Sequence, residues 1–310
     1  MSGNDPHPIS FPMANSSFLA DLRRRLDPLL PAKFRGDTPV VPVVRLSGAI
    51  GMATPFRPGV TFANTAKALE RAFAVKGAKA VALIINSPGG APAQSHLVYK
   101  RIRALAEEKE LPVIAFVEDV AASGGYMLAC AADEIVADVF SIVGSIGVVS
   151  AGFGFPRALE KLGIDRRVYT AGERKVMLDP FQPEKEEDIE RLKALQQEIH
   201  AAFVDLVKQR RGDVLSAEDS TLFSGEFWAA PQAQGLGLVD SIGDMRSFLR
   251  ARYGDKVRTP LIESRGGLFG RRSPGVMKLG DGFGGEVGAG AAEALISAAE
   301  ERASWARFGL

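Results

Sequence analysis

Two stretches of sequence decide the fold class: AVALIINSPGG at residues 80–90 and LPVIAFVEDVAASGGY at residues 111–126. Each begins with a short run, rich in Val and Ile, that is apolar at nearly every position (80–85 and 113–117). Such runs are typical of strands buried on both faces. Between them, apolar side chains recur at helical spacing, at Leu97, Val98, Ile102 and Leu105. The pattern predicts a strand, a crossover helix and a parallel strand, hence an α/β fold.

Further elements flank this unit. Residues 40–46 form another apolar run that predicts a buried strand. A long helix is predicted later, because Pro183 and the acidic residues 184–188 mark its start and Gly212 marks its end. Its apolar stripe consists of Ile189, Leu192, Ile199, Phe203, Leu206 and Val207. Residues 139–156 are uncharged, but four glycines interrupt them, so we predict strand and loop there instead of a membrane span.

Composition excludes several classes of function. The chain has 310 residues, 46% of them hydrophobic, and a net charge of +1, so it is a globular protein without the positive field that holds nucleic acid. A single cysteine cannot form an internal disulfide, and three histidines without further cysteines offer no structural zinc site. No apolar secretory stretch occurs in residues 1–15. We therefore expect a cytoplasmic protein without a bound metal.

Composition also divides the chain into four regions. Residues 1–38 are expected to form an amphipathic N-terminal arm, and residues 39–262 carry the periodic pattern of a folded domain. Residues 263–290 are rich in glycine and predict a linker, and residues 291–310 predict a C-terminal helix without an assigned role. We expect the arm to dock on its own domain or on a sister subunit. Peripheral adhesion to an anionic membrane surface is the alternative.

Two glycine-rich turns follow the predicted strands and are candidates for chemistry. Residues 86–90 place backbone N–H groups at a strand-to-helix turn, where they could hold a developing negative charge or serve only as a turn. Ser123 stands at the next strand-to-helix turn and could simply cap the helix. Its small neighbours favour a second interpretation, because they leave room for a substrate and Gly124 offers an N–H to an oxyanion.

A nucleophilic serine needs a base, and the histidines are poor candidates. His7 lies in the polar tail, His200 on the long charged helix, and His96 lacks a partner to orient it. A lysine could act instead if its surroundings keep the amine neutral. This requires the pKa of the lysine amine to fall from about 10.4 by about 3 units, which corresponds to about 4 kcal/mol. Burial away from water can cause a shift of this size.

Four motifs occur in an order that resembles one peptidase family. They are Ile85-Asn86-Ser87-Pro88-Gly89-Gly90, Asp119-Val120-Ala121-Ala122-Ser123-Gly124-Gly125-Tyr126, Val143-Gly144-Ser145-Ile146-Gly147-Val148 and Thr170-Ala171-Gly172-Glu173-Arg174-Lys175. Together they resemble the signal peptide peptidase A family (SppA/SohB-like) of Ser-Lys serine peptidases. The resemblance continues through residues 203–212 and 235–240 and covers roughly residues 40–250.

The resemblance implies roles for five residues. Ser123 matches the nucleophile and Lys175 the general base, 52 positions further along the chain. Ser145 matches the hydroxyl that orients the lysine. Gly90 and the N–H of Gly124 match the oxyanion hole. On composition alone, Lys175 is a surface lysine and Ser145 a turn residue, so these roles rest on the resemblance.

The resemblance also implies a fold, an assembly and a substrate class. Family members share the Clp/crotonase-like fold, with a repeated β-β-α superhelical core, a parallel sheet and outer helices. They need no cofactor, cleave hydrophobic or unfolded peptides such as signal-peptide remnants, and assemble into rings. This chain has one copy of the repeat and no evident transmembrane anchor. We therefore predict a homo-oligomer with active sites at subunit interfaces. In place of a transmembrane anchor, the amphipathic N-terminal arm could provide weak attachment to a membrane.

Two other functions remain open. Residues 124–133 also resemble the helix of crotonase-type acyl-CoA hydratases and isomerases, which work with acidic side chains and need neither Ser123 nor Lys175. The second alternative is a non-catalytic scaffold that binds hydrophobic peptides. Labelling of Ser123 by a fluorophosphonate would favour the peptidase, and stabilisation by coenzyme A would favour the crotonase-type enzyme.

Overall fold

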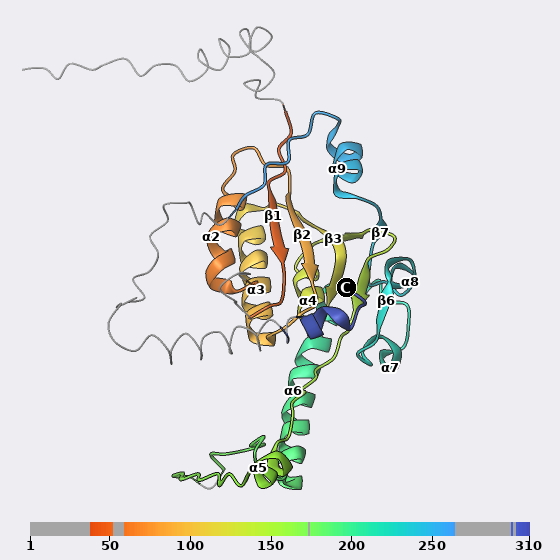
Figure 1. The fold of residues 1–310 in the computed structure, drawn as a ribbon. Coiled ribbons are helices and arrows are strands. Elements are labelled where there is room, and N and C mark those ends of the chain that lie inside the picture. Colours follow the sequence, from red (N-terminus) through yellow and green to blue (C-terminus); the bar gives the residue numbers. More distant parts are fainter. Residues whose placement is uncertain (1–37, 52–58, 173, 264–298, 300–301) are drawn as a thin grey trace, which may run out of the picture.

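A computed structural model describes residues 38–51, 59–172, 174–263, 299 and 302–310. The predicted N-terminal arm therefore lies almost entirely outside the described residues. The same holds for the predicted linker and for the first part of the predicted C-terminal helix. The described residues form a body and one long projection (Figure 1).

Strands and helices alternate along the body. The strands are β1 (Val43–Ser47), β2 (Val81–Ser87), β3 (Val113–Ala122), β4 (Glu134–Ala137), β5 (Ile142–Gly144), β6 (Phe227–Ala229) and β7 (Ser241–Ile242). The helices are α2 (Phe62–Phe73), α3 (Pro92–Lys109), α4 (Gly124–Ala129), α5 (Pro156–Leu162), α6 (Glu186–Arg211), α7 (Asp219–Leu222), α8 (Ala230–Gly235) and α9 (Met245–Tyr253). The three predicted buried strands, the crossover helix and the long helix are all present.

The strands form one sheet in the order β1-β2-β3-β4-β7, and each neighbouring pair in this order is parallel. β5 pairs in parallel with the end of β3, and β6 pairs antiparallel with β5. The registers Leu46↔Ile85 and Ile85↔Val117 align the carboxyl ends of β1, β2 and β3 at one edge. The prediction of an α/β fold with a parallel sheet and outer helices is therefore confirmed.

Both faces of the sheet are covered, which explains why its strands are apolar at nearly every position. Leu83 and Ile85 of β2 belong to the larger core, which also includes side chains of α2, α3 and α4. Ala82 and Ile84 point to the opposite face, where Leu249 of α9 belongs to the smaller core. The carboxyl edge of the sheet is thus held by packing on two sides.

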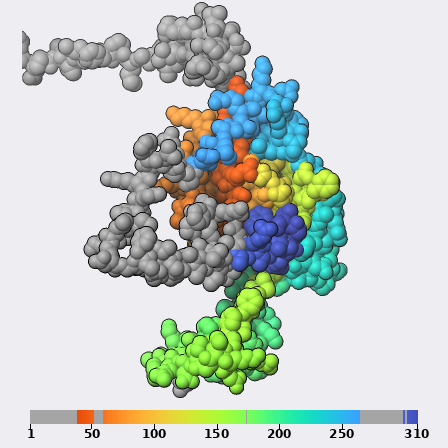
Figure 2. Space-filling view, viewed as in Figure 1, coloured from red at the N-terminus to blue at the C-terminus, as the bar shows by residue number. Residues whose placement is uncertain are grey.

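A projection stands out from the body and is formed by residues 149–172 and 174–192, which we call the stalk (Figures 1 and 2). It contains α5 and the first part of α6. The predicted apolar stripe of α6 is buried only in its second half, at Phe203, Leu206 and Val207. Ile189 and Leu192, at the other end of the stripe, are only partly buried, because that half of α6 extends beyond the body.

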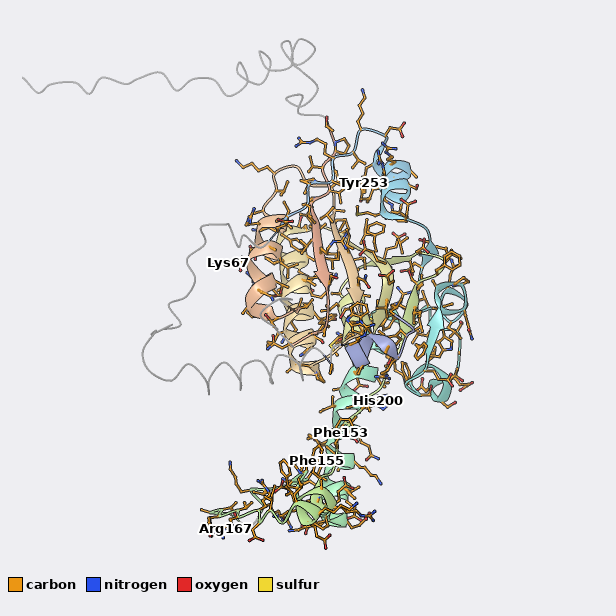
Figure 3. The ribbon with its side chains drawn as sticks, viewed as in Figure 1. Lys67, Phe153, Phe155, Arg167, His200 and Tyr253 are labelled. Atoms are coloured by element: carbon orange, nitrogen blue, oxygen red, sulfur yellow. The ribbon has the colours of Figure 1, made fainter. Side chains whose placement is uncertain are left out.

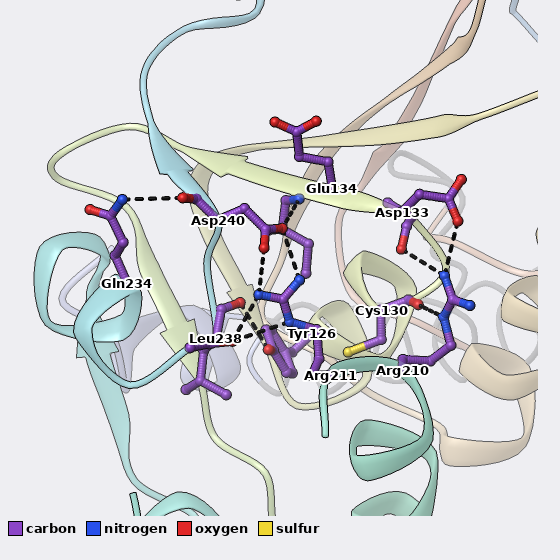
Figure 4. Close-up of polar contacts among 12 residues, drawn as sticks. Tyr126, Cys130, Asp133, Glu134, Arg210, Arg211, Gln234, Leu238 and Asp240 are labelled. Atoms are coloured by element: carbon purple, nitrogen blue, oxygen red, sulfur yellow. Dashed lines mark hydrogen bonds and ion pairs between the residues drawn. The ribbon is translucent and has the colours of Figure 1, made fainter. Parts of the chain in front are cut away.

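Two arginines fasten the end of α6 to the body (Figure 4). The buried guanidinium of Arg211 donates to both carboxylate oxygens of Asp240, at 2.8 and 2.9 Å, and to the carbonyl oxygen of Gly237 at 2.8 Å. Arg210 donates to the carbonyl oxygens of Cys130 and Ala132, both at 3.0 Å. These bonds satisfy carbonyl groups at the end of α4 and fix the direction in which α6 leaves the body.

Cys130 is fully buried at the C-terminal end of α4. Burial raises the pKa of its thiol from 9.0 to about 12. We expect no alkylation of the folded protein by iodoacetamide at pH 8, and rapid alkylation in denaturant. Because the unfolded thiol ionises at lower pH than the folded one, the contribution of Cys130 to stability should fall between pH 9 and 12. Labelling of the native chain as fast as the unfolded chain would contradict this burial.

Candidate active site

Ser123 occupies a strained turn between β3 and α4. Its φ of 52° and ψ of −122° lie in a region that L residues rarely adopt, at a cost of about 1–3 kcal/mol. Its N–H donates to the carbonyl oxygen of Gly144 at 2.8 Å, which holds the turn in place. The side chain makes no capping bond to α4. The helix-cap interpretation therefore fails, and the backbone has the sharp strand-to-helix geometry typical of a nucleophile elbow.

Ser123 faces a cavity of about 460 Å³ at the point where α6 leaves the body. Ser145 also lines this cavity, and α6 contributes Lys193, Gln197 and His200 to its wall. Figure 3 shows His200 at the junction of the body and the stalk. A hydroxyl group on a strained turn therefore opens into a space large enough for a peptide segment.

The turn at residues 89–90 is pressed against Ser123. A Cβ atom on Gly89 would lie 2.7 Å from the Cβ of Ser123, and one on Gly90 would lie 2.1 Å from the carbonyl oxygen of Ile50. Ile50 donates to the carbonyl oxygen of Gly89 and accepts from the N–H of Ala91, both at 2.8 Å. Ile50 and Gly90 thus form a parallel β-bridge, in which the N–H of Gly90 points away from Ile50.

Two backbone donors beside Ser123 therefore remain available. Within the described residues, the N–H groups of Gly90 and Gly124 have no hydrogen-bond acceptor. Gly124 is the first residue of α4, so its N–H is one of those that a helix leaves unpaired. The sequence singled out Gly90, whereas Gly89 is the position at which an added Cβ would collide with Ser123. The signal for both was the paired glycines after Pro88.

Ser145 lies across the cavity on a second strained turn, with a φ of 52°. It is buried, and its N–H donates to the carbonyl oxygen of Glu226 at 2.6 Å. Its hydroxyl makes no hydrogen bond with the described part of the chain. His200 Nε2 donates to the carbonyl oxygen of Ile146 at 3.1 Å, so α6 holds the turn that carries Ser145. Sequence reasoning gave His200 no place in the site, and only the tertiary fold brings it there.

The structure does not bring Lys175 to Ser123 within one chain. Lys175 is exposed on the stalk and does not line the cavity. Its neighbour Arg174 forms an ion pair with Glu187, with the nitrogen and oxygen 2.6 Å apart. His200 lies 13 residues after Glu187 on α6, which corresponds to about 20 Å along the helix axis. A lysine side chain cannot span that distance.

His96, the weak alternative for the base, lies outside this cavity. Its ring stacks on Tyr99, with ring centroids 6.0 Å apart, and both residues line a separate apolar groove with Phe203 and Met127. His96 therefore has the packing role expected by default. Lys193 and Arg307 line the cavity of Ser123, and the sequence singled out neither.

Two further observations concern metals and membranes. In the described ranges, no three His, Cys, Asp or Glu side chains gather in a way that could hold a metal ion. None of the helices described is sufficiently long and apolar to span a bilayer.

Comparison with known proteins places the chain in a family. The model of peptidase family S49 matches residues 105–254. A protein of Synechocystis sp. that carries a protease name is 32% identical over 231 residues, which cover 71% of this chain and 82% of that protein. The chain belongs to peptidase family S49. The matched region of this S49 chain includes Ser123, Ser145 and Lys175, whereas Gly90 precedes it.

Other relatives of the S49 chain are longer proteins. The chloroplastic serine protease SPPA of Arabidopsis thaliana is 36% identical over 168 residues, which cover 54% of this chain and 24% of that protein. A Brucella abortus protein named Na(+)/H(+) antiporter NhaA is 59% identical over 284 residues, or 91% of this chain. The S49 chain spans 38% of the length of the Brucella protein, so the name of the whole protein is not transferred to it.

Proposed function

We propose that this chain is a serine endopeptidase that hydrolyses peptide bonds with Ser123 as nucleophile and Lys175 as general base. The observation that carries the proposal is the strained Ser123 turn, which opens into the cavity beside the N–H groups of Gly90 and Gly124, for which the described residues offer no acceptor. The substrates that fit best are hydrophobic or unfolded peptides, signal-peptide remnants among them, as the resemblance to SppA/SohB-like peptidases implies.

The chemistry is acyl transfer to water. The neutral amine of Lys175 takes the hydroxyl proton of Ser123 as the serine oxygen attacks the peptide carbonyl carbon. The N–H groups of Gly90 and Gly124 donate to the oxyanion of the tetrahedral intermediate. The resulting ammonium then gives its proton to the leaving amine, which leaves an acyl-enzyme. Water, deprotonated by the same amine, attacks the ester and releases the acid and the free serine.

A second copy of the chain supplies the missing lysine in this proposal. The stalk exposes Phe153, Leu162 and Tyr169, with exposed fractions of 83%, 71% and 90%. No residue of α5 is buried in the single chain. Apolar side chains gathered on one projection mark an interaction site, and the exposed Lys175 lies on the same projection. Docking of the stalk on a neighbouring chain would cover these side chains and bring Lys175 to that chain's Ser123.

The surroundings of Ser145 suit this role. Ser145 is buried, and its hydroxyl, which bonds to none of the described residues, can accept a hydrogen bond from the arriving amine and orient it. The nearby cation Lys193 disfavours a second positive charge in the same space. Both features favour the neutral amine that deprotonates a serine.

A peptidase assay on an unfolded, hydrophobic peptide tests the proposed function. We expect Ser123→Ala and Lys175→Ala each to lower kcat/KM by about 1,000-fold or more, because the two groups act as one unit. The matched control is Lys161→Ala, which removes another exposed lysine of the stalk and should leave the rate unchanged. Wild-type Ser123 should also be labelled by a fluorophosphonate.

Two outcomes would overturn the proposed function. Hydrolysis that survives both substitutions would remove the dyad. Stabilisation by coenzyme A, without hydrolysis and without labelling of Ser123, would point to the crotonase-type chemistry instead.

A further inference from the structure

The C-terminal residues 302–310 return to the body and pack beside Ser123. Phe308 is buried against Val120 and Ala122 of β3, and Trp305 packs against the same cluster. The ring of Phe308 also meets the edge of the Phe227 ring, with centroids 5.0 Å apart. Figure 2 shows these dark blue residues on the body where the stalk begins. The segment is thus anchored one residue away from the proposed nucleophile.

This contact fills a place that the other described residues leave open. Val120 and Ala122 point away from the larger core, which receives their neighbour Ala121. Both are fully buried, and within the described residues their cluster is completed by Ile142 and the two C-terminal aromatic side chains. The C-terminal segment therefore acts as part of the site wall.

Arg307 lies between the two aromatic anchors and lines the cavity that holds Ser123. Lys193 lines the same cavity from α6. Neither cation forms an ion pair within the described part of the chain, and no Asp or Glu is among the described residues that line the cavity. Gln196 and Gln197 add amide groups that can donate hydrogen bonds. The cavity thus has two positive charges without a counter-charge.

We propose that Arg307 and Lys193 form a carboxylate-binding end of this cavity. A guanidinium group pairs with a carboxylate through two parallel N–H donors, and the lysine ammonium adds a second charge. The carboxylate comes from an acidic side chain of a bound peptide or from its free C-terminus. The consequence for cleavage, a preference for peptides with a carboxylate near the scissile bond, rests on the proposed function, whereas the binding preference does not.

Binding to Ser123→Ala full-length protein tests this site without hydrolysis. Fluorescent peptides of one hydrophobic sequence are compared as Glu and Gln versions and as free-acid and C-terminal amide versions, with affinity read from anisotropy. We expect about tenfold tighter binding of at least one carboxylate version, a typical gain for a charge-assisted hydrogen bond. The two pairs distinguish a side-chain carboxylate from a terminal one.

Matched variants assign the preference to the two cations. In the Ser123→Ala background, Arg307→Gln and Lys193→Gln should each reduce the tenfold ratio of affinities, carboxylate over uncharged peptide, to about threefold or less. Arg307→Lys should retain more of this ratio than Arg307→Gln. The controls Arg302→Gln and Arg191→Gln remove a cation from the C-terminal segment 302–310 and from α6, outside the cavity lining, and should keep the ratio. Tm values near that of the parent would show that the variants are folded.

Equal affinity for the carboxylate and amide versions would overturn the proposal, as would a ratio that survives both Arg307→Gln and Lys193→Gln. These results are independent of the proposed function. A wild-type chain that binds the carboxylate peptide selectively but never cleaves it would retain the carboxylate site and refute the peptidase.

Discussion

Mixing Ser123→Ala and Lys175→Ala chains is expected to restore peptidase activity that neither variant has alone. If each site takes its serine from one chain and its lysine from a neighbour, random assembly of equal amounts gives complete sites in about one case in four. The co-refolded mixture should therefore reach about a quarter of the wild-type kcat. Relative to either variant, this is a gain of at least about 100-fold.

The control for this experiment is a mixture of Lys175→Ala chains with chains that carry both substitutions. That mixture contains chains with Ser123 but no chain with Lys175, so it should stay inactive. If the Ser123→Ala and Lys175→Ala mixture also stays inactive while wild-type protein treated in the same way recovers, the two groups belong to one chain. The stalk would then have to fold back on its own body.

Loss of the Arg211 guanidinium is expected to cause the largest change in stability. Arg211→Met leaves the Asp240 carboxylate and the Gly237 carbonyl oxygen without their main donors in a partly buried site. Removing one partner of a buried ion pair typically costs about 3–5 kcal/mol in the free energy of unfolding. Urea denaturation followed by circular dichroism measures this change.

Arg101→Met provides the matched comparison, because Arg101 pairs with Glu70 at the surface, with the nitrogen and oxygen 2.7 Å apart. Exposed pairs contribute about 0–1 kcal/mol, so this variant should unfold close to the wild-type midpoint. The double variant Arg211→Met, Asp240→Asn should lose less than the sum of its single variants, because each substitution removes the same pair. An Arg211→Met variant that loses less than 1 kcal/mol would show that the network at the base of α6 is not important for stability.

The body of the fold was predictable from the sequence because local signals determine it. The apolar runs at 80–85 and 113–117 match the first parts of β2 and β3 to within one residue, since a strand covered on both faces needs apolar residues on both. The acidic turn and Gly212 marked the ends of α6 to within two residues. The stalk was not predictable, because the stripe at Ile189 and Leu192 would look the same whether its own domain or a neighbour covers it.

Part of the candidate site was likewise predictable from the sequence, and part of it was not. Ser123 follows β3 directly and Gly90 lies three residues after β2, so the parallel sheet places both at one edge. His200, Lys193 and Arg307 reach the cavity only through the direction of α6 and the docking of residues 302–310, which depend on long-range packing. The sequence therefore predicted that Ser123 and the two glycine N–H groups share one edge of the sheet, whereas the wall of the cavity formed by α6 and residues 302–310 required the structure.

The position of Lys175 in the assembled protein is the most direct test of the shared site. An experimental structure of the oligomer should place Lys175 Nζ of one chain within about 3 Å of Ser123 Oγ of a neighbouring chain, the hydrogen-bond distance that proton transfer requires. The same structure should show Phe153 and Tyr169 covered by that neighbour. If every Lys175 amine instead lies well beyond hydrogen-bond reach of every Ser123, within and between chains, the proposed dyad is wrong.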